Sequence, residues 1–413
     1  MSLPAELHSH AHERSAERLS CLETARQQTD ALFGILSPQA LYDRPVAQRH
    51  RFIFYVGHVE AFDWNLISSA LGMRAFHPSF DKLFAFGIDP DSSHLPADQP
   101  SDWPSLDEVM QYRDKCRERL EEAFNLIEDE LFSTALEHRL MHAETLAYLL
   151  HNVPYDQKRS PGNRGAVDSR SKIEQQWRNI PAGIATLGRS NGFGWDNEFA
   201  EHQVHAGAFR AQKFKVTNGD YLEFVKAGGT PSIFWYEEGG NLYLRGMFER
   251  VPLPPTGPVY VTHQQATAYA AWAGKRLMSE AEYHRAAFGT PEGAERCYPW
   301  GDEAPSNELG NFDFAAWDPV PVDAHPAGES AFGVAQLAGN GWEWTSTPFG
   351  PFEGFKERAY YPGYSKDFFD GEHFVLKGAS PRTAARFLRR SFRNWFRADY
   401  PYAYATFRLA ESL

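Results

Sequence analysis

Two histidines four residues apart, His138 and His142, lie in an H-x3-H-x-E motif. Apolar residues recur at helical spacing around them, and no proline or glycine interrupts residues 121–152, so the motif is predicted to lie on a helix. Residues four apart lie one turn above each other, and both imidazoles can therefore bind one metal ion. Glu144 lies roughly 160° around the helix from His142, which favours a supporting carboxylate over a ligand.

A third candidate ligand is His58, in an apolar stretch that also contains Phe62 and Trp64. A lone histidine in such a stretch is more often a core or surface residue than a ligand. With 16 histidines in 413 residues, chance alone gives about 0.6 pairs at this spacing, so the motif needs independent support. Spacing alone also leaves zinc and iron open.

These histidines require a helical framework to bring them together. Helices are predicted over residues 15–36 and 51–71, and Ser105 with Glu108 forms a capping box for a third helix. That helix is expected to end near residues 125–127 and to continue, with a bend, into the histidine helix. Residues 76–103, rich in Pro, Asp and Ser, are expected to form a long loop. Four such helices predict a bundle, and bundles commonly build metal sites in their cores.

The composition changes after the histidine helix. We expect a helical domain over residues 1–155, a polar linker over 156–182 and a second domain over 183–413. The second domain is rich in Gly, Pro and aromatic residues, with helices expected only over 217–226, 262–272 and 279–287 among short strands and loops. The fold class is therefore α+β.

Charge and cysteine content exclude several classes of protein. A net charge of −13 argues against nucleic acid or an anionic membrane as partner. Three scattered cysteines form neither a disulfide framework nor a cysteine-based metal site. There is no apolar stretch of membrane-spanning length and no signal-peptide pattern at the start, so a soluble cytoplasmic protein acting on small molecules is expected.

Five motifs in the second half resemble a known fold. They are AGKRLMSEAEY at 273–283, YPWG at 298–301, GNGWEWT at 339–345, FRNW at 392–395 and FR at 407–408. In this order they resemble the formylglycine-generating-enzyme-like fold, a variant of the C-type-lectin fold. Cys297 is the only cysteine of this domain, so the reactive cysteine pair of true formylglycine-generating enzymes is absent and thiol-based copper chemistry is not expected.

The first half resembles DinB-like four-helix bundles. The two folds in this order resemble the ergothioneine-pathway sulfoxide synthases and their relatives, the selenoneine synthases. The resemblance implies a non-haem Fe(II), O2-dependent oxidoreductase that forms a C–S or C–Se bond on the imidazole carbon of hercynine. It also implies that His58, His138 and His142 are the iron ligands.

The resemblance further implies where hercynine binds. Asn394, Trp395 and Phe396 fall where the family has its betaine-binding residues, and Met141 stands where some members carry a Gln. Some members carry an Asp at the position of Phe396. Tyr360, Tyr361 and Tyr364 lie in the stretch where some members have a catalytic tyrosine, but no alignment singles one out, so no catalytic acid is assigned.

The chalcogen donor is predicted from the loop at 87–103. It contains four Asp and no Arg or Lys, whereas some members that use γ-glutamylcysteine carry an Arg-rich loop there. An acidic loop repels a dianionic donor and suits a hydroxyl-rich one, which favours selenoneine synthase with a selenosugar donor. Alternatively, the loop faces solvent and the donor is γ-glutamylcysteine or cysteine. Two other classes stay open, namely a zinc-dependent thiol transferase of the DinB-like kind and a lectin-like binding module.

Overall fold

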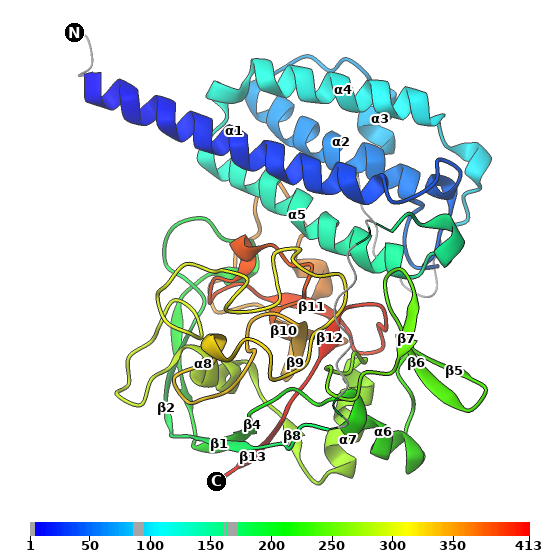
Figure 1. Cartoon of the computed structure of the whole chain (residues 1–413). Helices are drawn as coiled ribbons and strands as arrows, with labels where there is room; N and C mark the ends of the chain where they lie inside the picture. The colour runs from blue at the N-terminus through cyan, green and yellow to red at the C-terminus, as the bar shows by residue number, and fades with distance from the viewer. Residues whose placement is uncertain (1–4, 86–94, 161, 163–169, 171) are drawn as a thin grey trace. The chain divides into compact units, whose positions relative to one another are not determined.

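The computed structural model describes residues 5–85, 95–160, 162, 170 and 172–413, with side chains described from residue 15 onward. The chain divides into two compact units, Met1–Asn163 and Arg164–Leu413. The first unit is helical and the second combines short strands with three helices among its described residues (Figure 1). This architecture confirms the predicted α+β class.

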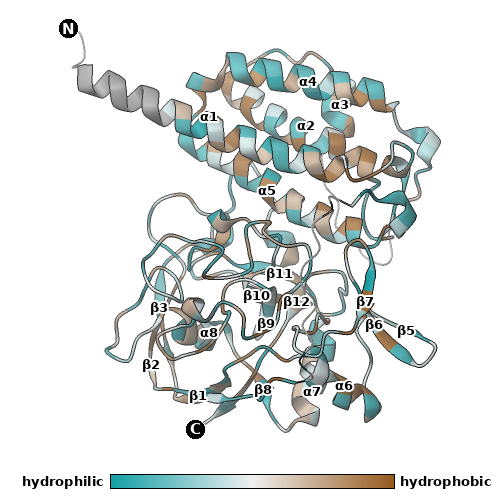
Figure 2. Cartoon of the chain, in the orientation of Figure 1, coloured by the Kyte–Doolittle hydropathy of each residue, from teal (hydrophilic) through white to brown (hydrophobic). Residues whose placement is uncertain are grey.

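The first unit is built on four long helices, as predicted, with one short helix between the second and third. Their bounds are α1 Ala5–Phe33, α2 Phe52–Leu71, α3 Pro78–Leu83, α4 Leu106–Glu122 and α5 Asp129–His151. Helix α2 packs against both α4 and α5, and α1 packs against α5. Nearly all of α2 is buried, whereas α4 carries a brown apolar stripe beside teal polar residues (Figure 2). Helix α2 is therefore the centre of this unit.

Three predictions for the helical unit differ from the structure. Helix α1 begins at Ala5, ten residues before the expected start. The expected continuous helix is interrupted by a 3-10 turn at Phe124–Leu126, after which α5 begins separately. Asn125 accepts a hydrogen bond from Ser15 of α1 in this turn, a tertiary contact with no local sequence signal. The expected loop at 76–103 contains α3, because the His77 ring accepts a hydrogen bond from the Phe80 amide and Pro78 follows at the first helical position.

The second unit contains several small sheets. Its strands are β1 Trp177–Ile180, β2 Gly183–Leu187, β3 His202–Ala206, β4 Phe209–Gln212, β5 Trp235–Glu238, β6 Asn241–Arg245, β7 Arg250–Pro252, β8 Arg276–Leu277, β9 Gly341–Pro348, β10 His373–Ala379, β11 Asn394–Arg397, β12 Ala405–Thr406 and β13 Leu409–Ser412. One four-stranded sheet has the order β11-β10-β9-β12, and another has the order β1-β4-β13-β8. The first of these carries two of the motifs found in the sequence.

The three helices of the second unit lie where the sequence predicts them. Helices α6 Asn218–Lys226, α7 His263–Trp272 and α8 Glu280–Phe288 each begin after a capping box. The expected linker at 156–182 is shorter in the structure, because Lys158 bridges Leu36 in the first unit and β1 pairs with β4 in the second. A four-residue strand next to breaker-rich sequence is too short for periodicity to detect.

A buried ion network holds the GNGWEWT motif in the core of the second unit. The Arg408 guanidinium donates to both carboxylate oxygens of Glu343, at 2.6 and 2.7 Å, and the Lys215 ammonium donates to one of them at 3.1 Å. All three side chains are at most 1% exposed. Trp342 and Trp344 are each 2% exposed and belong to the core.

The Arg408 network predicts a large stability effect. In Arg408→Leu the Glu343 carboxylate stays buried with one partner fewer, so the free energy of unfolding of the second unit should fall by about 3–5 kcal/mol. Urea denaturation followed by tryptophan fluorescence measures this change. Arg397→Leu is the matched control, because its pair with Glu372 is solvent-exposed and should contribute less than about 1 kcal/mol. Equal losses of unfolding free energy in the two variants would contradict this stabilising role of the Arg408 network.

Candidate metal centre

Three imidazoles converge inside the helical unit. His58 comes from α2 and His138 and His142 from α5, and their ligand atoms all lie within 4.8 Å of one another. The Nε2 atom of His142 lies 3.1 Å from that of His58 and 3.2 Å from that of His138. With metal–nitrogen bonds of roughly 2.1 Å, two ligands at right angles lie roughly 3.0 Å apart. The arrangement therefore fits one bound ion, and it brings together all three predicted ligands.

Packing fixes the orientation of two of the rings. The Nδ1–H of His58 donates to the Phe84 carbonyl at 2.7 Å, which leaves the Nε2 lone pair of His58 directed at the other histidines. Phe54 stacks on His58 with ring centroids 4.8 Å apart, and Phe62 stacks on His138 at 3.4 Å. Rings held in this way need little reorganisation when an ion binds.

The three histidines are neutral at pH 7. Burial lowers the pKa of His58 to about 4, and burial together with the neighbouring imidazoles holds the pKa values of His138 and His142 well below the ordinary range. His142 is half-buried as a residue, but its Nδ1 atom is enclosed. Neutral imidazole is the form that binds metal, and it suits iron and zinc alike. In an octahedral ion, three histidines leave three positions for substrates.

A buried charge network lies beside the triad. The Arg139 guanidinium donates to Glu60 at 2.9 and 3.0 Å and to Asp63 at 2.6 Å, which joins α5 to α2. Arg117 of α4 donates to Glu60 as well and forms a bidentate pair with Asp30 of α1. Burial would raise the pKa of Glu60, but Arg139 and Arg117 lower it to about 2, while burial raises the pKa of Asp63 to about 6. All four long helices of the bundle are thereby connected.

The predicted hercynine-binding residues lie in two places. Met141 is half-buried on α5, directly before His142. Asn394, Trp395 and Phe396 form the start of β11. Successive side chains of a strand point to opposite faces, so Trp395 faces away from Asn394 and Phe396. At most two of these three side chains, those of Asn394 and Phe396, can therefore contact a ligand on the same face of β11.

Aromatic side chains surround Trp395. Phe349 stacks on it with ring centroids 4.2 Å apart and planes 7° apart, and Tyr364 meets it edge-on at 5.3 Å. Tyr361 contacts Tyr364 at 5.4 Å, and burial with the nearby Asp196 raises the pKa of Tyr361 to about 12. The structure thus brings two of the three tyrosines from the sequence to this cluster, a contact between segments some 30 residues apart that no local pattern predicts.

The loop at 87–103 carries less uncompensated negative charge than its composition suggests. Asp98 forms ion pairs with Arg44 and Arg51 and accepts a hydrogen bond from the Trp103 indole at 2.7 Å. Two arginines from an earlier segment therefore compensate the charge of Asp98, which reduces the repulsion that this residue can contribute.

The other acidic residues of this loop divide into two groups. Asp102 accepts a hydrogen bond from the Gln99 amide at 2.7 Å and caps the 3-10 turn Pro100–Asp102. Asp102 thus helps to hold this 3-10 turn. Its hydrogen bond to a neutral amide leaves the negative charge of Asp102 in place. Asp89 and Asp91 lie outside the described residues, so the prediction of a charge-repelling loop depends on Asp89, Asp91 and Asp102.

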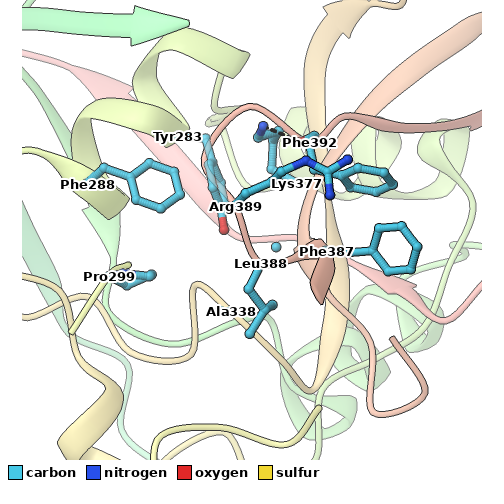
Figure 3. A pocket seen from close by; sticks show the side chains of 10 residues that line it. Tyr283, Phe288, Pro299, Ala338, Lys377, Phe387, Leu388, Arg389 and Phe392 are labelled. Carbon is cyan, nitrogen blue, oxygen red and sulfur yellow. Dashed lines mark hydrogen bonds between the residues drawn. The ribbon is translucent and has the colours of Figure 1, made fainter. Parts of the chain in front are cut away.

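A cavity in the second unit is too small for a substrate. It has a volume of about 10 Å³ and lies among Tyr283, Lys377 and Arg389 (Figure 3). This is room for about one water molecule. The Lys377 ammonium donates to the carbonyls of Arg390 and Phe392, at 2.9 and 2.5 Å, so it stabilises the fold there.

Gly57 makes the orientation of His58 testable. A Cβ atom at Gly57 would lie 2.6 Å from carbons of the fully buried Phe84 ring. Gly57→Ala should displace Phe84 and with it the carbonyl that orients His58. Because supporting contacts of this kind are worth about 10- to 100-fold in metal affinity, Co(II) binding followed by absorbance should weaken by that factor. The control Gly207→Ala meets no atom within 4 Å and should bind Co(II) normally, and normal binding by both variants would contradict this role.

Comparison with known families matches both units. Residues 165–413 match the family model described as Sulfatase-modifying factor enzyme 1-like domain. Residues 22–152 match the DinB superfamily. These two matches agree with the folds that the sequence motifs resemble.

Several relatives share this combination or part of it. A protein of Mycolicibacterium smegmatis named hercynine oxygenase is 34% identical over 306 residues, which cover 65% of this chain and 68% of the relative. The hercynine oxygenase of Mycolicibacterium thermoresistibile is 41% identical over 229 residues, half of each chain. Ergothioneine biosynthesis protein 1 of Neurospora crassa is 26% identical over 493 residues, covering 92% of this chain and 56% of the relative. The matched region spans about half the length of most of these relatives.

Proposed function

The chain belongs to the ergothioneine-pathway family in which a DinB-type bundle precedes a sulfatase-modifying factor enzyme 1-like domain, and from this premise we propose that it is an Fe(II)- and O2-dependent oxidoreductase acting on hercynine. The observation that carries the proposal is the convergence of three neutral imidazoles, with Nε2 atoms 3.1 and 3.2 Å apart. The reaction forms a C–Se or C–S bond at the imidazole carbon of hercynine.

The chain's own residues have distinct tasks in this proposal. His58, His138 and His142 hold the ion, and the stacked Phe54 and Phe62 keep water from two of the rings. When bound, Fe(II) supplies the redox chemistry with O2 that zinc lacks. With a thiol donor, one C–H and one S–H bond break, a C–S bond forms, one oxygen atom stays on sulfur and the other leaves as water. A selenol donor follows the same balance.

Hercynine binding is assigned to Met141, Asn394, Trp395 and Phe396. The trimethylammonium group of hercynine is attracted to aromatic faces, and Trp395 has the larger face and the richer aromatic surroundings. Asn394 and Phe396 share the other side of β11. Trp395 and the Asn394–Phe396 pair are therefore alternative contacts for one trimethylammonium group. No residue is assigned as catalytic acid.

The proposal predicts iron binding and O2 consumption that depend on the triad. Anaerobically reconstituted protein should bind one Fe(II) per chain and consume O2 when hercynine and a donor are present. His58→Ala, His138→Ala and His142→Ala should each lose iron binding and activity, as measured by iron analysis and an oxygen electrode. His205→Ala, an exposed histidine of β3, should retain both.

Two outcomes would redirect the assignment. Full iron affinity in all three triad variants would exclude the metal centre. Turnover of a thiol substrate under strict anaerobiosis would favour a metal-dependent thiol transferase of the DinB type, which is the second candidate because the triad also suits zinc.

We propose a selenosugar as the chalcogen donor, with γ-glutamylcysteine or cysteine as the alternative. Since Arg44 and Arg51 compensate the charge of Asp98, repulsion of a dianionic donor by this loop would come from Asp89, Asp91 and Asp102. A 1-seleno sugar should then show a kcat/KM at least about tenfold above that of γ-glutamylcysteine, equivalent to about 1.4 kcal/mol. Steady-state kinetics with both donors and a thio sugar measure this and separate the effect of selenium from that of charge.

Matched variants test the charge argument directly. Asp89→Asn combined with Asp91→Asn should narrow the gap between the sugar and the dianionic donor, because it removes like-charge repulsion. Asp107→Asn, in the exposed first turn of α4, is the control and should leave the gap unchanged. A preference of the parent protein for γ-glutamylcysteine over both sugars would assign it to sulfoxide synthesis instead.

A further inference from the structure

We propose that the helical unit contains a second small-molecule site, which binds a ligand with an apolar body and one anionic head group. A cavity of about 300 Å³ opens between α1, α2 and α4, and its lining comes only from described residues of this unit. This volume falls at the lower end of the range of small-molecule binding sites.

The cavity is separate from the metal centre. Val56 and Glu60 of α2 line it, one turn apart on the same face of the helix. His58 lies between them in sequence, roughly 200° around the helix from Val56, and points to the opposite side. A ligand in this cavity would therefore occupy the face of α2 that the histidines do not use.

Most of the lining is apolar and would surround the body of a ligand. It comes from the end of α1, the segment after it, α2 and the start of α4, namely Phe33, Gly34, Leu36, Pro38, Leu41, Val56, Leu106 and Met110. Leu36, Leu41 and Val56 are at most 6% exposed, so they form the floor. Removal of an apolar chain from water against this floor supplies the main driving force for binding.

The acidic residues of the cavity are already compensated. Asp30 and Glu60 both accept hydrogen bonds from the Arg117 guanidinium, at 2.6 to 2.8 Å, and Glu60 is also bonded to Arg139. Neither carboxylate therefore offers an unbalanced negative charge to a cationic ligand.

Two further arginines of the lining give the cavity its positive charge. Arg113 pairs with Asp114, whose side chain is 64% exposed, so solvent screens this pair and the guanidinium still attracts an anion. Arg159 is exposed, and its backbone amide donates to the Ile35 carbonyl, which fixes it beside the end of α1. Guanidinium groups bind carboxylates and related anions through paired hydrogen bonds. The lining thus selects an anionic head group over a neutral or cationic one.

Titration calorimetry on the full chain tests this proposal with three ligands of equal chain length. Decanoate should bind at one site per chain, at least tenfold more tightly than 1-decanol or decyltrimethylammonium. Replacing both arginines, Arg113→Gln with Arg159→Gln, should weaken decanoate binding by roughly tenfold or more and leave 1-decanol binding unchanged. Arg119→Gln, on the same helix but paired with exposed Glu122, is the control and should bind decanoate normally.

A cavity-filling variant locates the binding. Met110→Trp should abolish binding of both decanoate and 1-decanol, and Met110→Phe serves the same purpose if the tryptophan variant has a lowered melting temperature. Decanoate binding that survives both the filling variant and the arginine pair would overturn the proposal. So would co-sedimentation with phosphatidylglycerol vesicles that depends on Arg113 and Arg159, because it would show that the arginines bind a membrane surface.

Discussion

The candidate metal centre depends on the burial of one guanidinium. Arg139 has no exposed surface, and a buried charge costs several kcal/mol unless it is paired and fully hydrogen-bonded. Glu60, Asp63 and the carbonyl of Val59, all in α2, accept its hydrogen bonds, and the Thr29 hydroxyl of α1 accepts one more. Pairing this charge therefore favours the register of α5 against α2 that brings Arg139 to these groups. His138 directly precedes Arg139, His142 follows it by three residues and His58 precedes Glu60 by two, so that register also sets the distances between the imidazoles.

The two faces of helix α2 line two different sites. One face presents His58, flanked by the stacked Phe54 and Phe62, and the opposite face presents Val56 and Glu60 to a cavity. A helix buried on nearly every side has no polar stripe, so hydrophobic periodicity gives no indication of which face has which role. No membrane-spanning helix is found among the described residues, despite this apolar character.

Features set by neighbouring residues could be predicted from the sequence, whereas contacts between segments far apart in the chain could not. The pairing of His138 with His142 follows from helical spacing alone, and the Ser105–Glu108 capping box correctly places the start of α4. His58 required a family resemblance, because no local pattern relates α2 to α5. The Phe84 carbonyl could not be found at all, since a backbone acceptor has no residue-type signal. The separation of Trp395 from its two neighbours follows from strand alternation, but only once β11 is known to be a strand.

The loop at 87–103 shows why composition misleads about electrostatics. A ligand responds to a carboxylate together with its partners, and Asp98 lies against two guanidinium groups from a segment some 50 residues earlier. Counting charges within the loop therefore overestimates the repulsion that a dianionic donor meets. The same reasoning applies in the opposite direction to the cavity beside α2, where two carboxylates line the wall but share the charge of Arg117. In both places, the electrostatic potential that a ligand meets depends on which charged side chains are compensated by ion pairs. Only the tertiary structure identifies those pairs.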